Sequence, residues 1–142
     1  MKFRKLTARQ IRDFLPTMPF NTLVGVQLTR THADGVTIEC EVRKELFNSA
    51  GVVHGGVTAT LVDAAVGISL NRHLGGATPL TTIELKINYF RPVSQGKIYA
   101  RAYLLRVGSS ICVGRVELTD SQKNPIGAGM VTYMILPHRA IS

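Results

Sequence analysis

Asp63 is the one charged side chain between Glu45 and Arg72, in a segment whose other residues are mostly apolar or small. From about Val57 onward this segment predicts a helix that is apolar on nearly every face. A carboxylate inside such a helix is costly to keep ionised unless nearby groups compensate it, and acidic residues are seldom fully buried without a partner. Reaction chemistry is therefore expected around Asp63. The alternative is a structural role, in which the carboxylate accepts hydrogen bonds within the fold or at an interface.

The residues just before this helix are of the polar and flexible types that a reaction centre needs: Asn48, His54, Gly55 and Gly56. Backbone N–H groups in the first helical turn have no intrahelical partner, and the helix dipole favours negative charge beside them. A glycine there lets a ligand approach the backbone closely. Asp63 follows Gly55 by about 12 Å along the helix, at about 1.5 Å per residue. One helix therefore does not easily place both groups at the same atom of a ligand.

The sequence patterns on either side of these groups predict a single α+β domain over residues 1–142. A short helix is expected over 7–15, then a turn with Pro19 and Phe20, and a long helix over 57–74. Alternating or β-rich patterns predict six strands: 24–32, 36–43, 80–90, 97–107, 110–119 and 126–136. Because strands and helices do not alternate, the sheet is expected to be antiparallel and to curve around the long helix. The edges of such a sheet invite pairing with a second copy of the chain.

The charge balance is strongly basic, with 17 Lys and Arg against 9 Asp and Glu and a formal net charge of +8. A basic surplus is typical of proteins that bind a polyanion, such as nucleic acid, a membrane surface or a phosphorylated ligand, and also of a plain basic surface. No RNA-binding aromatic pattern or helix-turn-helix is visible, so a nucleic-acid partner is not expected. Five basic residues precede the first acid: Lys2, Arg4, Lys5, Arg9 and Arg12.

Cysteine usage and hydropathy indicate the compartment. Cys40 and Cys112 lie in strand patterns without metal-ligand spacing, so both are interpreted as free buried thiols in a reducing environment. No window approaches the roughly 20 apolar residues of a membrane span, and no apolar run follows the basic start as in a signal peptide. A cytoplasmic location without a membrane span is therefore expected.

Two strings make the chain recognisable: NSAGVVHGGVTATLVDAA over 48–65 and YFRP over 89–92. The first resembles the acyl-CoA thioesterases of the phenylacetate-degradation type, a group that includes the animal thioesterase-superfamily member 2 proteins. The resemblance covers roughly residues 20–136. It implies the hotdog fold, in which a curved six-stranded antiparallel sheet wraps a long central helix. It also implies hydrolysis of an acyl- or aryl-CoA thioester to the free acid and CoA.

The resemblance assigns roles to the residues already singled out. The Gly55 backbone N–H would polarise the thioester carbonyl, where oxyanion charge develops. Asp63 would activate water as a general base, or attack the carbonyl itself and form an anhydride. Gly55 of one subunit would work with Asp63 of its dimer partner, so a homodimer is required, and dimers are expected to pair into a homotetramer. Asn48 and His54 would orient water and carbonyl, or hold the helix entry in shape.

Thr82 is expected on the same grounds to lie beside the acid, where the family often has Ser or Thr. Strict alternation within 80–90, however, puts Thr82 on the face opposite Ile83, Leu85 and Ile87. The resemblance and the strand pattern therefore make opposite predictions for this side chain.

The resemblance also implies that coenzyme A, which belongs to the substrate, lies along the strand ends. The residues expected to bind it are Tyr89, Arg91, Arg106, Gly108, Ser109 and Ser110. Arginine suits phosphate geometry, although Arg91 and Arg106 also fit the description of solvated charges at strand ends. No separate cofactor and no metal site are expected.

Two other functions stay open on the sequence. A dehydratase or hydratase of the same fold would pair a catalytic His with an acid in a different frame, which is not found here. A non-catalytic acyl-CoA-binding or sensing module needs an attached DNA-binding domain to act as a regulator. The stretch before the hotdog region, about 20 residues, is too short for such a domain.

Overall fold

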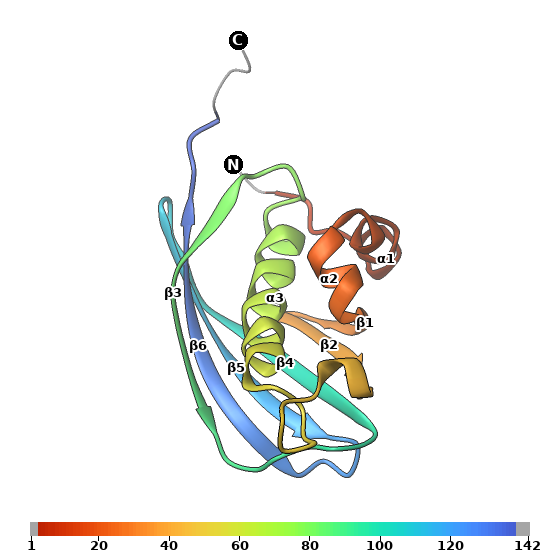
Figure 1. Cartoon of the computed structure of the whole chain (residues 1–142). Coiled ribbons are helices and arrows are strands. Elements are labelled where there is room, and N and C mark those ends of the chain that lie inside the picture. Colours follow the sequence, from red (N-terminus) through yellow and green to blue (C-terminus); the bar gives the residue numbers. More distant parts are fainter. Residues whose placement is uncertain (1–2, 139–142) are drawn as a thin grey trace.

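The computed structural model describes residues 3–138, so Lys2 of the basic N-terminal group lies outside the described residues. One mixed sheet-and-helix unit contains the elements expected from the sequence (Figure 1). The helices are α1 (Ala8–Phe14), α2 (Pro19–Val24) and α3 (Gly55–His73), with 3₁₀ turns η1 (Leu15–Thr17) and η2 (Lys44–Leu46). The strands are β1 (Val26–His32), β2 (Gly35–Glu41), β3 (Leu80–Tyr89), β4 (Lys97–Val107), β5 (Ile111–Asp120) and β6 (Pro125–Ile135).

The six strands form one antiparallel sheet in the order β1-β2-β4-β5-β6-β3, which confirms the predicted sheet. The sheet curves around α3, the long helix in its concave face (Figure 1). Apolar side chains of α3 such as Leu61, Val62, Val66 and Ile68 are almost fully buried and form the centre of the core. The helix is two residues longer at its start than predicted, because His54 caps it directly before Gly55.

Glycines on β5 and β6 let α3 lie close to the sheet. A Cβ on Gly129 would stand 2.7 Å from a Val62 methyl group and 2.8 Å from the Lys86 carbonyl oxygen. A Cβ on Gly114 would stand 2.8 Å from a methyl group of Val66. Since real Cβ atoms do not approach other heavy atoms so closely, these glycines set the distance between the helix and the sheet.

The N-terminal segment differs from the prediction in one element. The helix expected over 7–15 is α1, but the turn expected around Pro19 and Phe20 is the helix α2. Proline favours the first helical position, and Gly25 ends α2 with a left-handed φ of 92°. The strand expected from residue 24 therefore begins only at Val26.

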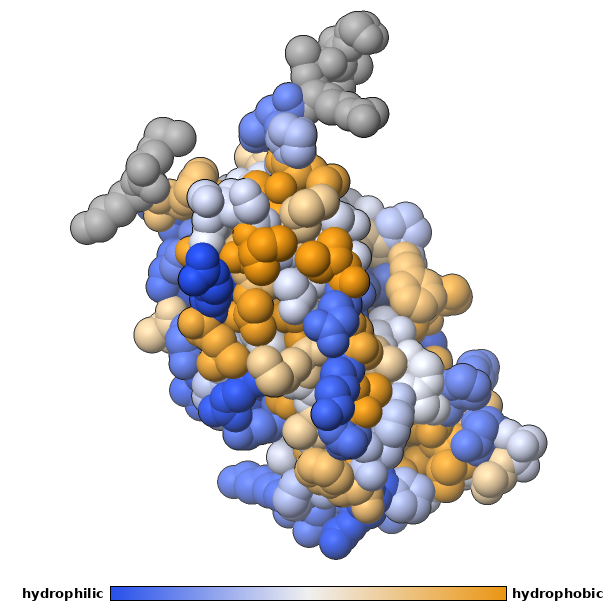
Figure 2. All heavy atoms as spheres, turned by 90° about the vertical axis from the view of Figure 1, so that its left-hand side faces the viewer, coloured by the Kyte–Doolittle hydropathy of each residue, from blue (hydrophilic) through white to orange (hydrophobic). Residues whose placement is uncertain are grey.

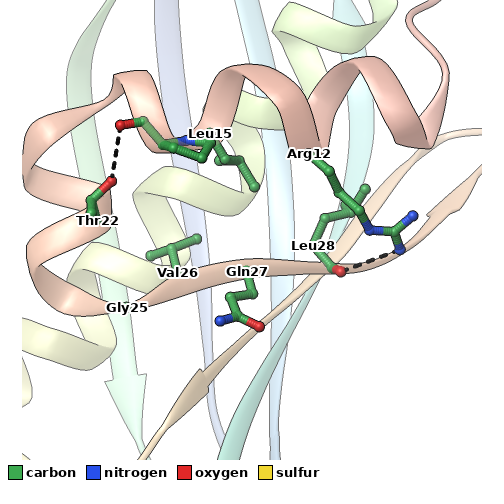
Figure 3. A pocket seen from close by; sticks show the side chains of 8 residues that line it. Arg12, Leu15, Thr22, Gly25, Val26, Gln27 and Leu28 are labelled. Atoms are coloured by element: carbon green, nitrogen blue, oxygen red, sulfur yellow. Dashed lines mark hydrogen bonds between the residues drawn. The ribbon is translucent and has the colours of Figure 1, made fainter.

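The N-terminal helices cover the β1 edge of the sheet. The Arg12 guanidinium reaches the carbonyl oxygens of Leu28 and Thr29 at 3.5 and 3.3 Å, and Lys5 donates to the Ala33 carbonyl at 2.8 Å. A cavity of about 370 Å³ separates Leu15 and its neighbours from this strand (Figure 3). Two members of the basic N-terminal group thus have structural roles, and this edge is obstructed against pairing with another chain.

The opposite edge, β3, is open. It pairs only with β6 among the described strands, and much of it is exposed. Its exposed apolar side chains include Ile83 and Tyr89, with Met130 nearby on β6. Figure 2 looks onto this side of the molecule and shows apolar residues gathered between hydrophilic ones. A partly apolar edge strand with unpaired backbone groups, such as β3, is suited to pairing with a second chain.

Cys40 and Cys112 are both buried, and neither forms a disulfide, as predicted. Burial raises the pKa of each thiol above its usual value. Within residues 3–138, no helix has the length and apolar character needed to cross a membrane.

Candidate active site

The carboxylate of Asp63 is held by two hydroxyl groups. Thr82 Oγ1 donates to Asp63 Oδ1 at 2.8 Å, and the Tyr133 hydroxyl lies 2.7 Å from the same oxygen. The Tyr133 hydroxyl also lies 3.0 Å from the backbone carbonyl oxygen of Asp63. No described residue donates a hydrogen bond to Oδ2, so this oxygen is available to a water molecule or a substrate.

Thr82 reaches Asp63 because β3 contains a β-bulge. Thr82 pairs with Tyr133, but the next pair along the ladder is Glu84 with Thr132, so Ile83 has no partner on β6. The extra residue changes the side-chain alternation, as β-bulges do. Thr82 therefore points inward while Ile83 is 51% exposed. The strand pattern that put Ile83 on the inner face and Thr82 on the outer face was wrong at this point.

Tyr133 is the residue of this cluster that the sequence analysis missed. It lies on β6, some 70 residues from Asp63 along the chain, and no local motif marks it. Only its position opposite Thr82 in the β3–β6 ladder brings it to the carboxylate. Burial raises the pKa of the Tyr133 phenol, and the neighbouring Asp63 charge raises it further.

A cavity of about 390 Å³ opens beside Asp63. Asp63, Thr82 and Tyr133 line one part of it, and Met18 and Phe20 from the η1–α2 region line another. The other lining residues are Asn21, Thr60, Ala64, Gly67, Ile68, Asn71, Leu80 and Thr81. The cavity thus combines a carboxylate with a mixed wall of apolar and polar side chains, and its apolar part can accept an apolar portion of a substrate.

The entry of α3 presents an unpaired donor. His54 Nδ1 accepts a hydrogen bond from the Gly56 N–H at 2.8 Å, and the His54 carbonyl accepts one from Val57 at 2.9 Å. No described group accepts a hydrogen bond from the Gly55 N–H. The Tyr89 hydroxyl donates to the Gly55 carbonyl at 2.6 Å, which fixes the orientation of the following peptide plane. His54 is thus an N-cap, and Gly55 supplies the free N–H.

Asn48 shapes the loop that leads into α3. Its Oδ1 accepts hydrogen bonds from the N–H groups of Ala50 and Val52 at 2.9 and 3.3 Å, and its own N–H donates to the Val52 carbonyl at 2.8 Å. Of the two roles considered for Asn48 and His54, these contacts correspond to holding the helix entry in shape.

A second cavity of about 350 Å³ surrounds the helix entry. Gly55, Asn48, Tyr89 and Arg91 line it, together with Val53, Thr58, Phe90, Pro92, Val93 and Ile126. It shares no lining residue with the cavity at Asp63. Within one chain, the free N–H and the carboxylate therefore face different spaces.

The residues expected to bind CoA form two groups. Tyr89 and Arg91 lie at the end of β3 beside Gly55. Arg106, Gly108, Ser109 and Ser110 lie around the β4–β5 turn, where Ser110 accepts a hydrogen bond from Ile135 at the end of β6. Ile135 pairs with Leu80, so this turn is at the opposite end of β3. One chain does not bring the two groups together.

Among residues 3–138, no three His, Cys, Asp or Glu side chains gather closely enough to hold a metal ion.

Comparisons with known proteins identify the family. Residues 50–126, more than half of the chain, match the model of the thioesterase superfamily. The chain is 28% identical over 137 residues to the medium/long-chain acyl-CoA thioesterase YigI of Escherichia coli, covering 86% of this chain and 88% of that protein. It is 31% identical over 99 residues to mouse acyl-coenzyme A thioesterase 13, covering 69% and 70%.

A solved structure supports the same fold. The thioesterase HI1161 from Haemophilus influenzae superposes with a TM-score of 0.87 at 19% identity, over 99% of this chain and 100% of that one. The phenylacetic acid degradation protein PaaI from Thermus thermophilus, studied as a mutant, superposes with a TM-score of 0.74 at 23% identity, over 83% and 99%. The expected hotdog fold is thereby confirmed, and the chain belongs to the thioesterase superfamily as a thioester hydrolase.

Proposed function

We propose that this protein hydrolyses acyl-CoA thioesters at a site completed by a second copy of the chain, with Asp63 of one subunit acting on a carbonyl held by Gly55 of the other. The observation that carries the proposal is the division of the machinery between two cavities. The free N–H of Gly55 and the free Oδ2 of Asp63 belong to the same helix but face different spaces. A second chain is the simplest way to bring the Gly55 N–H of one copy close to Asp63 Oδ2 of the other.

The contacts between α3 and β3 suggest how two copies would meet. Near one end of the site Tyr89 bonds Gly55, and near the other Thr82 bonds Asp63. A two-fold axis that exchanges these ends passes near Ala59 on α3, midway between Gly55 and Asp63. Such an isologous interface places each Gly55 beside the partner's Asp63.

The same axis crosses β3 midway between Thr82 and Tyr89, close to Leu85. An antiparallel β3–β3 pair centred on Leu85 places Glu84 opposite Lys86 of the second copy, on the exposed face of each strand. Opposite charges directly across a ladder stabilise the pairing, whereas like charges oppose it. The open β3 edge and the obstructed β1 edge favour the same arrangement.

The reaction follows from these two groups. The Gly55 N–H donates to the thioester oxygen and stabilises the negative charge that develops there. Asp63 Oδ2 removes a proton from water while the water oxygen attacks the carbonyl carbon. When the tetrahedral intermediate collapses, the C–S bond breaks and CoA leaves as the thiol after taking up that proton, which releases the free acid. In the second route, Oδ2 attacks the carbonyl carbon and the C–S bond breaks, so that CoA leaves as the thiolate. Water then hydrolyses the anhydride to the free acid and the Asp63 carboxylate, and the proton that this releases passes to the CoA thiolate.

The two-fold arrangement also accounts for the two groups of CoA-binding candidates. It brings the β4–β5 turn of one copy, with Arg106 and Ser109, toward the Tyr89 and Arg91 end of the other. CoA would then lie across the interface, with its phosphates near arginines. Its acyl group would enter the cavity between Asp63, Met18 and Phe20. The name of YigI makes medium- and long-chain acyl-CoAs the first aliphatic substrates to assay.

The test is CoA release from a panel of acyl-CoAs by wild type and by Asp63→Asn. The panel spans short, medium and long aliphatic chains together with phenylacetyl and hydroxybenzoyl groups. Asparagine keeps the shape and still accepts hydrogen bonds from Thr82 and Tyr133, but it neither takes a proton nor attacks a carbonyl. Turnover should fall by about 10²-fold or more, as expected for loss of a general base.

The control is the melting temperature and dimer content of the same Asp63→Asn preparation, which should match the wild type. A folded, dimeric Asp63→Asn protein with undiminished turnover would refute the proposal. Pairing of dimers into a homotetramer and a cytoplasmic location stay predictions from the sequence, to be checked by light scattering and by fractionation of cells.

A further inference from the structure

We infer that Tyr133 is a positioning residue of this hydrolase, holding Asp63 Oδ1 so that Oδ2 faces the reacting carbonyl. The inference rests on the proposed role of Asp63 and adds to it a residue that no local sequence motif marks. Tyr133 lies on β6, which is paired on both sides in the sheet, and its hydroxyl reaches the carboxylate on α3.

The geometry around Oδ1 is the first support. Both hydroxyl groups, from Thr82 at 2.8 Å and from Tyr133 at 2.7 Å, reach the same carboxylate oxygen. A carboxylate held through one oxygen by two donors on different strands has little freedom to rotate. The second oxygen accepts no hydrogen bond from a described residue and stays available to a ligand in the cavity that Asp63 lines. A fixed orientation is what a base or nucleophile needs, because misplacement by even 1 Å is costly in rate.

Gly67 provides the second support. This glycine lies one helical turn after Asp63, and a Cβ there would stand 2.6 Å from the Tyr133 hydroxyl oxygen and 3.3 Å from the ring carbon that carries it. The tyrosine hydroxyl therefore occupies the space that any larger residue at position 67 would take. The absence of a side chain at Gly67 is what lets the phenol lie against α3 and reach the carboxylate.

The protonation state of Tyr133 suits the role. Its side chain is largely buried, with 8% exposed, and burial raises the pKa of the phenol well above its usual value. The hydroxyl therefore keeps its proton throughout the physiological range and remains a donor. Its single proton points to Oδ1 or to the Asp63 carbonyl oxygen at 3.0 Å, and the shorter contact with the charged oxygen is favoured.

A purely structural role makes a different prediction. If Tyr133 only anchors β6 to α3, loss of its hydroxyl changes stability and leaves turnover of the folded enzyme unchanged. If it positions Asp63, the loss lowers kcat and leaves KM nearly unchanged, since the substrate keeps its own contacts. The split between kcat and KM therefore separates the two roles.

The experiment compares Tyr133→Phe with wild type and Asp63→Asn on the best substrate of the panel. We expect kcat to fall about tenfold, equivalent to about 1.4 kcal/mol of transition-state stabilisation, because Asp63 Oδ1 loses one of the two donors that orient it. If Tyr133→Phe keeps the wild-type kcat while Asp63→Asn is inactive, the inference about Tyr133 is overturned and the proposed function stands. Full activity of Asp63→Asn would instead refute the proposed function.

Gly67→Ala provides an independent route to the same effect. Its methyl group should displace the Tyr133 hydroxyl and lower kcat to a similar extent. In a Tyr133→Phe background the closest clashing atom is absent, so adding Gly67→Ala should lower kcat little further. If the double variant instead loses kcat by the product of the two single losses, the two substitutions do not act through the same Tyr133 hydroxyl, and the inference is contradicted. Melting temperatures of all three variants identify any loss that is due to unfolding.

Discussion

At the scale of single residues, the candidate chemistry depends on two atoms that the fold leaves without partners. His54 and Tyr89 bind the groups next to the Gly55 N–H, but nothing described binds the N–H itself. Thr82 and Tyr133 bind one oxygen of Asp63 and leave the other free. Polar groups near a protein interior are usually paired, so a free donor and a free acceptor surrounded by paired neighbours indicate places for a ligand.

Gly55→Pro tests the donor at this scale. Proline removes the N–H at a first helical position, where it is well tolerated, and His54 already has the extended backbone that a residue before proline prefers. A Cβ at position 55 would stand 3.1 Å from the Tyr89 hydroxyl oxygen, in proline and in alanine alike. We expect kcat/KM to fall by about 10²-fold, the usual cost of losing one oxyanion donor. Acyl-CoA hydrolysis measured beside Gly55→Ala, which retains the N–H, provides the control. Equal activities in the two variants would exclude the Gly55 N–H as the donor.

At the scale of elements, two irregular features position the site. The bulge at Ile83 turns Thr82 toward α3, and the glycines of β5 and β6 let α3 approach the sheet closely enough for Thr82 and Tyr133 to reach Asp63. A regular β3 would direct Thr82 away from the helix. A sheet with larger side chains at Gly114 and Gly129 would hold the helix farther from the hydroxyls.

Gly129→Ala should lower the free energy of unfolding by roughly 1–3 kcal/mol, the range for overpacking a filled core. The added methyl group has no room between Val62 and the Lys86 carbonyl. Urea denaturation measures the change, with Leu105→Ala, an exposed apolar residue on β4 away from the β3 edge, as the control. That control should stay within about 0.5 kcal/mol of wild type. A Gly129→Ala protein as stable as wild type would show that α3 moves away from the sheet at little cost.

At the scale of the whole molecule, the two edges of the sheet differ in a way that favours one mode of association. Arg12 and the N-terminal helices obstruct β1, whereas β3 keeps an open, partly apolar edge (Figures 1 and 2). Pairing through β3 would join two sheets and bring both halves of each site together. Assembly and catalysis would then depend on the same surface.

The register of this interface is testable by cross-linking. If β3 pairs with its copy around Leu85, residues 84 and 86 of different chains lie opposite each other, at Cβ separations of about 5 Å. Co-expressed Glu84→Cys and Lys86→Cys chains should therefore form disulfide-linked dimers under mild oxidation, seen on non-reducing gels. Gln27→Cys on the β1 edge serves as the control and should stay uncross-linked. Cross-linking through position 27, and not through positions 84 and 86, would place the interface at the β1 edge and contradict pairing through β3.

The sequence by itself determined the elements and most of the site. Apolar periodicity located α3 and all six strands to within two residues at each end, because side-chain burial follows the local pattern. The isolated charge of Asp63 and the polar groups before Gly55 pointed to the candidate site, because a charge in an apolar segment stands out in the sequence itself. The helix α2 was missed because Pro19 signals a turn as readily as a helix start.

Tertiary structure alone decided the rest. The inward direction of Thr82 depends on a bulge that only pairing with β6 defines, and alternation within one strand cannot reveal it. Tyr133 reaches Asp63 through ladder register across a long sequence separation, and Gly67 makes space for it from a third element. Such contacts arise from how elements pack, whereas a local pattern records only which side of its own element a residue occupies.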